Sequence, residues 1–133
     1  MNIKSSIAVF TVALVLCGAA FAHHSFAMFD RTKEVELKDA TVKEWQWTSP
    51  HSWLLIWVPN GTSQPDAYSI EGTNPGILRR LGYTKGIMSP GDKVTVYMNP
   101  LKSGDKGGSL LAVILPDGRM LGARLAGNES TTP

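Results

Sequence analysis

The chain has 133 residues, with 13 lysine and arginine side chains, 11 aspartate and glutamate side chains and a formal net charge of +2. This near balance, without a block of like charge, argues against a nucleic-acid partner, because a grip on the phosphate backbone needs many clustered cations. The single cysteine excludes an intrachain disulfide and a metal site built from several thiolates.

Residues 1–22 have the pattern of a secretory signal peptide. Lys4 supplies the positive start, Ile7 to Leu16 is almost wholly apolar, and Ala20 and Ala22 are the small residues at −3 and −1 of a cleavage site. The apolar stretch is shorter than the roughly 20 residues that span a bilayer, and no later stretch is long and apolar enough. We therefore expect a periplasmic or secreted protein, cleaved after Ala22, with no membrane span in the mature chain.

An alternative maturation route is lipidation of Cys17, which follows the apolar stretch. A lipoprotein signal places a small residue just before its cysteine, whereas Leu16 is large, so cleavage after Ala22 is preferred. We then expect one domain, residues 23–126, which begins with an N-terminal arm from His23 to Thr32. The polar tail, residues 127–133, is expected to be disordered.

The first predicted strand, residues 34–47, is extended but changes phase. Its apolar side chains fall at odd, then even, then odd positions: Val35 and Leu37, Ala40 and Val42, Trp45 and Trp47. Strict alternation would not shift, so the pattern predicts bulges in one long, bent strand. Residues 52–58 predict a second strand that is apolar on both faces. An Asn60-Gly61 turn and a third strand, residues 67–71, follow.

A short helix is predicted next. Asn74 suits its N-cap, Pro75 its first position and Gly82 the position just after its end. Its apolar stripe, which we expect to face the core, consists of Ile77, Leu78 and Leu81.

The remaining pattern predicts a turn at residues 89–92, a strand at 93–98, a glycine-rich loop at 103–108, a strand at 110–115 and a short edge segment at 119–123. Val94, Val96 and Met98 are expected to face inward. Three strands, a short helix and two more strands match a mainly β fold, a small OB-like five-stranded barrel with one helix between strands three and four. The alternative is a small open β-sandwich with a crossing helix.

Five segments resemble those of a family of small exported bacterial proteins of unknown function. They are His23-His24-Ser25-Phe26, Trp47-Thr48-Ser49-Pro50-His51-Ser52-Trp53, Asn74-Pro75 with Leu78-Arg79-Arg80, Pro90-Gly91-Asp92-Lys93-Val94, and Leu115-Pro116-Asp117-Gly118-Arg119. The resemblance covers nearly the whole mature chain. It implies export, a single domain, and a binding or accessory module more than an enzyme.

All three histidines lie in two of these segments. A neutral imidazole is the commonest protein ligand for zinc and copper. After cleavage, the α-amine and imidazole of His23 could chelate one ion, and His51 would complete a copper(II) site. His24 is the reserve ligand. The competing interpretation is that His23 and His24 merely follow the cleavage site and that His51 hydrogen-bonds to the backbone.

A second version of the site uses soft ligands, because thioethers favour copper(I) and the face of a tryptophan attracts cations. Its candidate residues are His51, Trp45, Trp47, Trp53, Met28 and Met98.

The tryptophans also allow a function without metal. Trp45, Trp47, Trp53 and Trp57 fall on two strands that we expect to be neighbours. Two or three of them exposed together, with Trp45, Trp47 and Trp53 the preferred set, would present an apolar surface to a protein or glycan partner or another small ligand, whereas core packing is the plainer interpretation. No nucleophile elbow, zincin helix, P-loop or dinucleotide-binding glycine motif is present, so we expect a binding protein and not an enzyme. Apart from copper, no cofactor is expected.

Overall fold

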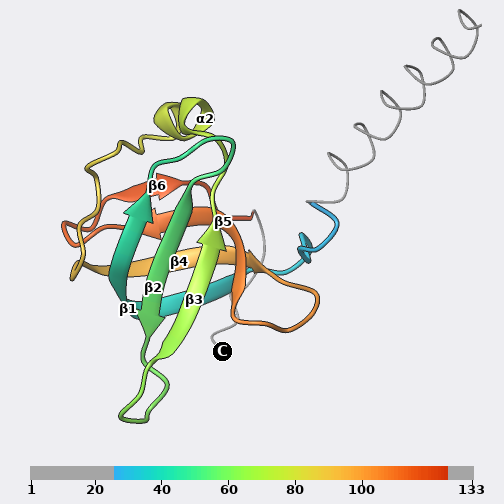
Figure 1. Ribbon diagram of the computed structural model, residues 1–133, viewed down its shortest axis with the longest axis vertical. Coiled ribbons are helices and arrows are strands. Elements are labelled where there is room, and N and C mark those ends of the chain that lie inside the picture. The colour runs from blue at the N-terminus through green and yellow to red at the C-terminus, as the bar shows by residue number, and fades with distance from the viewer. Residues whose placement is uncertain (1–25, 126–133) are drawn as a thin grey trace, which may run out of the picture.

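Six strands form one sheet that closes on itself in the computed structural model, which describes residues 26–125 (Figure 1). The strands are β1 (Val35–Gln46), β2 (Trp53–Val58), β3 (Asp66–Glu71), β4 (Lys93–Pro100), β5 (Gly107–Ile114) and β6 (Met120–Gly122). Their order is β3-β2-β1-β4-β5-β6, and a parallel pairing of β3 with β5 closes the barrel. The helix α2 (Pro75–Arg80) lies between β3 and β4 in the chain and at one end of the barrel. The predicted OB-like barrel is therefore confirmed.

The long first strand bends at two register shifts. One falls between Leu37 and Ala40 in the pairing with β4, and the other between Val42 and Glu44 in the pairing with β2. Asp39, inside the first shift, has a positive φ of 54°. These irregularities are the predicted bulges, and they keep the inward side chains buried although their spacing departs from two.

The core fills the barrel interior with side chains from all the long strands. Val94, Val96 and Met98 are buried, as predicted. The largest of the fully buried side chains are Tyr83, Leu37, Leu54, Ile56 and Ile70.

The helix has the predicted termini but not the predicted burial. The Asn74 side chain accepts a hydrogen bond from the Ile77 backbone N–H (3.0 Å), and Gly82 follows the helix with φ +90°. Of the expected apolar stripe only Leu78 is buried, at 2% exposure, whereas Ile77 is 44% and Leu81 42% exposed. Six residues make fewer than two turns, so one side chain fills the barrel end and its neighbours remain at the rim.

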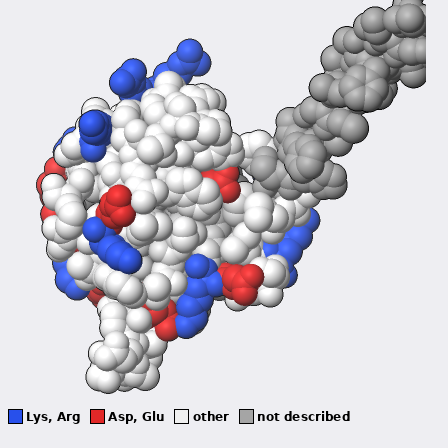
Figure 2. All heavy atoms as spheres, in the orientation of Figure 1, with Lys and Arg blue, Asp and Glu red and all other residues white. Residues whose placement is uncertain are grey.

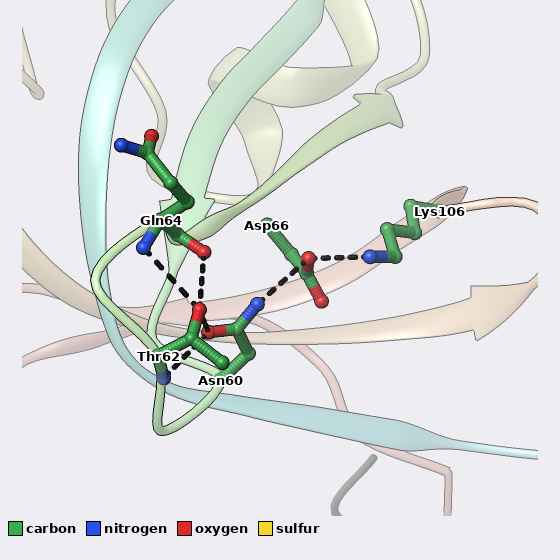
Figure 3. Close-up of polar contacts among 5 residues, drawn as sticks. All are labelled: Asn60, Thr62, Gln64, Asp66 and Lys106. Carbon is green, nitrogen blue, oxygen red and sulfur yellow. Dashed lines mark hydrogen bonds and ion pairs between the residues drawn. The ribbon is translucent and has the colours of Figure 1, made fainter.

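The loop between β2 and β3 is held by its own polar side chains (Figure 3). Asn60 accepts hydrogen bonds from the backbone N–H (3.0 Å) and hydroxyl (2.7 Å) of Thr62, and it donates to Asp66 (3.0 Å). Asp66 also pairs with Lys106 from the loop between β4 and β5. These contacts fix the register of the hairpin, in which Trp53 lies opposite Glu71.

The segment before β1 is anchored by one aromatic side chain. Phe29 is buried and forms a bridge with Leu101, and the Asp30 backbone N–H donates to the Pro100 carbonyl (2.8 Å). Phe26 and Met28 are exposed. The predicted signal peptide, His23, His24 and the tail at 127–133 lie outside the described residues. Within residues 26–125, no helix is long and apolar enough to cross a membrane.

Candidate functional site

His51 sits in a short loop between β1 and β2. The loop contains a cis Ser49–Pro50 peptide bond, and the Thr48 hydroxyl donates to the His51 carbonyl (2.7 Å). The next residue, Ser52, is fully buried. Its backbone N–H donates to the Thr73 carbonyl (3.2 Å), and its own carbonyl accepts from the backbone N–H of Gly72 (2.8 Å). These bonds attach the loop to the end of β3.

The side chain of His51 contacts a carboxylate at that end. Its Nδ1 meets Oε1 of Glu71, and the His51 and Glu71 side chains are 32% and 14% exposed. When Nδ1 carries the proton and donates it to Glu71, the lone pair of Nε2 remains available to a ligand. A carboxylate partner of this kind fixes the ring orientation of metal-binding histidines and raises their basicity.

A cavity of about 410 Å³ opens beside this pair, within the size range of small-molecule sites. The polar residues of its lining are His51, Glu71, Thr73, Asn74 and Ser109, and the others are Gly72, Phe26, Phe29, Pro50, Ile77, Leu78, Leu81, Leu110 and Leu111. The site therefore combines one imidazole, one carboxylate and a mainly apolar recess.

Of the predicted metal ligands, only His51 can be placed, because His23 and His24 lie outside the described residues. Within the described range, no group of three or more histidine, cysteine, aspartate or glutamate residues is arranged to hold a metal ion. Phe26, three residues after His23, lines the same cavity as His51.

The three tryptophans of the predicted surface do not share one face. Trp45 is in the core at 9% exposure, between Trp47 and Tyr83 (ring centroids 5.6 and 5.9 Å away), and its indole N–H donates to the Thr84 carbonyl (3.0 Å). Trp53 lies opposite Gln46, next to the Trp45–Leu54 pair, so its side chain takes the other face of the sheet. The half-buried Trp47 instead packs against the core.

The soft-ligand candidates are also dispersed. Met28 and Trp53 line a second cavity of about 140 Å³, which shares Phe29 and Glu71 with the larger one. Met98 is buried at 2% exposure. His51 lines only the larger of these two cavities.

Glu71 is the site residue that sequence reasoning missed. On the sequence it looks like one of several solvent-facing strand carboxylates. The Asn60-Gly61 turn predicts that β2 and β3 pair, but the connecting loop spans residues 59–65 and Val58 lies opposite Asp66. The turn alone therefore does not give the register that places Glu71 beside His51.

The chain matches the model of a family of unknown function, DUF6152, over residues 12–110. No curated protein and no solved structure matches it. Most of the chain is covered by the family model, and this agrees with the resemblance noted in the sequence. The protein therefore belongs to the DUF6152 family.

Proposed function

We propose that this protein is a small exported binding protein that holds a copper-type metal ion. The ligands are Nε2 of His51 and the α-amine and imidazole of His23 after cleavage at Ala22, with His24 nearby and Glu71 orienting His51. The observation that carries the proposal is the contact between His51 Nδ1 and Glu71 Oε1 beside a cavity.

The chemistry of this pair supports a metal ligand. A histidine that binds a metal through one ring nitrogen usually donates the other N–H to a carboxylate or a carbonyl. Glu71, 14% exposed, supplies that carboxylate, while His51 keeps 32% of its side chain open to solvent. An imidazole that only closed a loop would need neither the carboxylate nor the access.

The reach of the chain supports the second half of the site. Phe26 lines the cavity, and a chain of three residues spans at most about 10 Å. A terminus at His23 thus has the length to bring its amine and ring to His51. Three nitrogen ligands suit copper(II) or zinc, with copper the tighter in the usual order of affinities.

The second candidate function is a metal-independent module that presents aromatic side chains to a protein or glycan. The outer face of β2 favours it, because Trp53, Leu55 and Trp57 alternate along that face and Trp57 is 36% exposed. Lys43 lies over the Trp57 ring, 5.1 Å from its centroid. Of the four tryptophans considered for such a surface, Trp53 and Trp57 lie on this face, whereas Trp45 and Trp47 of the preferred set do not.

The proposal is tested on protein recovered from its exported compartment. Mass spectrometry should give His23 as the first residue, and titration with copper(II) should give one site with nitrogen ligands in the electron paramagnetic resonance spectrum. We expect His51→Ala to weaken binding at least tenfold and Glu71→Gln to weaken it about 10- to 100-fold. Glu44→Gln, which changes an exposed carboxylate of β1, is the matched control. A different terminus, or wild-type affinity in His51→Ala, would contradict the proposal.

A further inference from the structure

Exposed apolar side chains gather around the larger cavity. Among residues 26–125, six large hydrophobic side chains are exposed, and three of them border this cavity: Phe26 (58%), Ile77 (44%) and Leu81 (42%). Below them the wall continues with Leu78, Leu110 and Leu111. A concave apolar surface whose rim keeps bulky side chains in water is typical of a ligand site. In Figure 2, the surface below α2 is mostly free of charged side chains.

The charges of the wall select the ligand. Among the described residues of the lining, Glu71 is the one acidic side chain, and neither lysine nor arginine contributes. Oε1 of Glu71 contacts His51, whereas Oε2 makes no hydrogen bond among the described residues. A half-buried carboxylate with a free oxygen attracts a cation and repels an anion, and low solvent access strengthens both effects.

The neighbouring cavity offers a contrast. It is about a third of the size, at about 140 Å³, and Lys106 contributes to its wall together with Glu71. A positive side chain at that position opposes a cationic ligand. Both cavities include Glu71, but the larger one has about three times the volume and no lysine in its described lining, whereas Lys106 of the smaller one is also paired with Asp66.

We propose that the larger cavity binds a small amphipathic amine. Its ammonium group donates hydrogen bonds to Oε2 of Glu71, and its hydrocarbon part lies against Ile77, Leu81 and Leu110. This inference does not rest on metal binding, because it needs neither His23 nor a metal ion.

The test uses full-length mature protein in a chelating buffer, so that metal is excluded. Three probes share a phenyl ring and differ in charge: 2-phenylethylamine, 2-phenylethanol and phenylacetate. Chemical shifts of the isoleucine and leucine methyl groups locate and quantify binding. We expect the amine to shift the methyl signals of Ile77, Leu81 and Leu110, and to bind at least about tenfold more tightly than the alcohol, with phenylacetate weakest.

Two variants separate the charge from the apolar wall. Glu71→Gln should weaken the binding of 2-phenylethylamine about tenfold or more and leave the binding of 2-phenylethanol unchanged. Binding of the alcohol thus reports whether the cavity is intact. Ile77→Ala should weaken both probes alike, while Met120→Ala, an exposed apolar residue outside the cavity lining, should change neither.

Three outcomes would overturn the inference. They are equal binding of phenylacetate and the amine, amine binding that survives Glu71→Gln, and shifts that map to the outer face of β2. Failure of copper binding would leave all three readouts unaffected, so the two proposals fail separately.

Discussion

The carboxylate of Glu34, just before β1, is held by Arg124, 90 positions later in the chain. The Glu34 side chain is completely buried, and Oε1 accepts hydrogen bonds from Nη2 (2.7 Å) and Nε (2.8 Å) of the guanidinium. The other oxygen accepts the Leu125 backbone N–H (2.8 Å), and the guanidinium lies over the Tyr97 ring, 4.2 Å from its centroid. One buried charge thus joins the two ends of the described chain.

Arg124→Met should therefore destabilise the fold. The change leaves the buried Glu34 carboxylate without its guanidinium, and a buried charge that loses its partner is strongly unfavourable. We expect the midpoint of thermal unfolding, followed by circular dichroism, to fall by at least about 10 °C. Adding Glu34→Gln should recover part of that loss, because the charge is then removed.

The control for this prediction is Arg119→Met. Arg119 also pairs with a carboxylate, Asp117, but both side chains are mostly exposed, at 63% and 52%. Exposed pairs contribute little, so the midpoint should move by no more than about 2 °C. Equal losses in the two variants would contradict the role assigned to burial.

The barrel was predictable because local patterns agree with one another. Phase shifts in residues 34–47 predicted bulges, and Asn74, Pro75 and Gly82 fixed the helix termini within one residue. The pairing of Glu34 with Arg124 was not predictable. Neither residue lies in a periodic pattern that relates it to the other, and only closure of the barrel brings them together.

The site was predictable in part. His51 could be found because the chain has only three histidines and an imidazole is a common metal ligand wherever it lies in a sequence. Glu71 could not, because a carboxylate in a strand is ordinary until the register of β2 and β3 places it beside an imidazole. The prediction that Ile77, Leu78 and Leu81 all face the core was wrong for two of them. Their spacing indicates that they share one side of the helix, but the end of the barrel has room for Leu78 alone.

Trp45 and Trp57 should respond differently to substitution and to quenching. Trp45→Phe removes a buried indole and its hydrogen bond to Thr84, so we expect a loss of about 2 kcal/mol in the free energy of unfolding. Trp57→Phe should change it by less than about 0.5 kcal/mol. Urea unfolding measures both. The emission of each tryptophan is the difference between the wild-type spectrum and that of the variant that lacks it. We expect acrylamide to quench the emission of Trp57 and not that of Trp45. The reverse pattern would place Trp45 at the surface.

Gly108 marks a close approach between β4 and β5. A Cβ atom there would lie 2.3 Å from the Asn99 carbonyl oxygen and 2.7 Å from Sδ of Met98. Gly108→Ala should therefore cost at least about 3 kcal/mol or prevent folding, because the strand backbone cannot move aside. Gly86→Ala is the matched control, since a Cβ there meets nothing within 4 Å. The free energy of unfolding of this variant should stay within about 0.5 kcal/mol of the wild-type value. A folded Gly108→Ala protein of normal stability would contradict the observed packing.

Tyr83 should make the protein sensitive to alkaline pH. Its hydroxyl donates to the Leu121 carbonyl (3.1 Å), and burial raises the pKa of the phenol well above its ordinary value. In the unfolded chain the phenol ionises near pH 10, as in model peptides. Above that pH the unfolded state loses a proton that the folded state keeps, so stability falls as pH rises from about 10 toward the folded pKa.

Tyr83→Phe removes this dependence at the cost of one hydrogen bond. At pH 7 we expect the variant to be less stable by about 1 kcal/mol. Between pH 10 and 11 the wild type should lose about 1 kcal/mol more than the variant, so the two curves of unfolding free energy against pH converge. Urea unfolding at half-unit pH steps measures this difference. Tyr97, whose pKa is raised by burial and by its hydrogen bond to Glu36, titrates in both proteins and cancels. Parallel curves over that interval would mean that the Tyr83 phenol ionises as readily in the folded barrel as in the open chain.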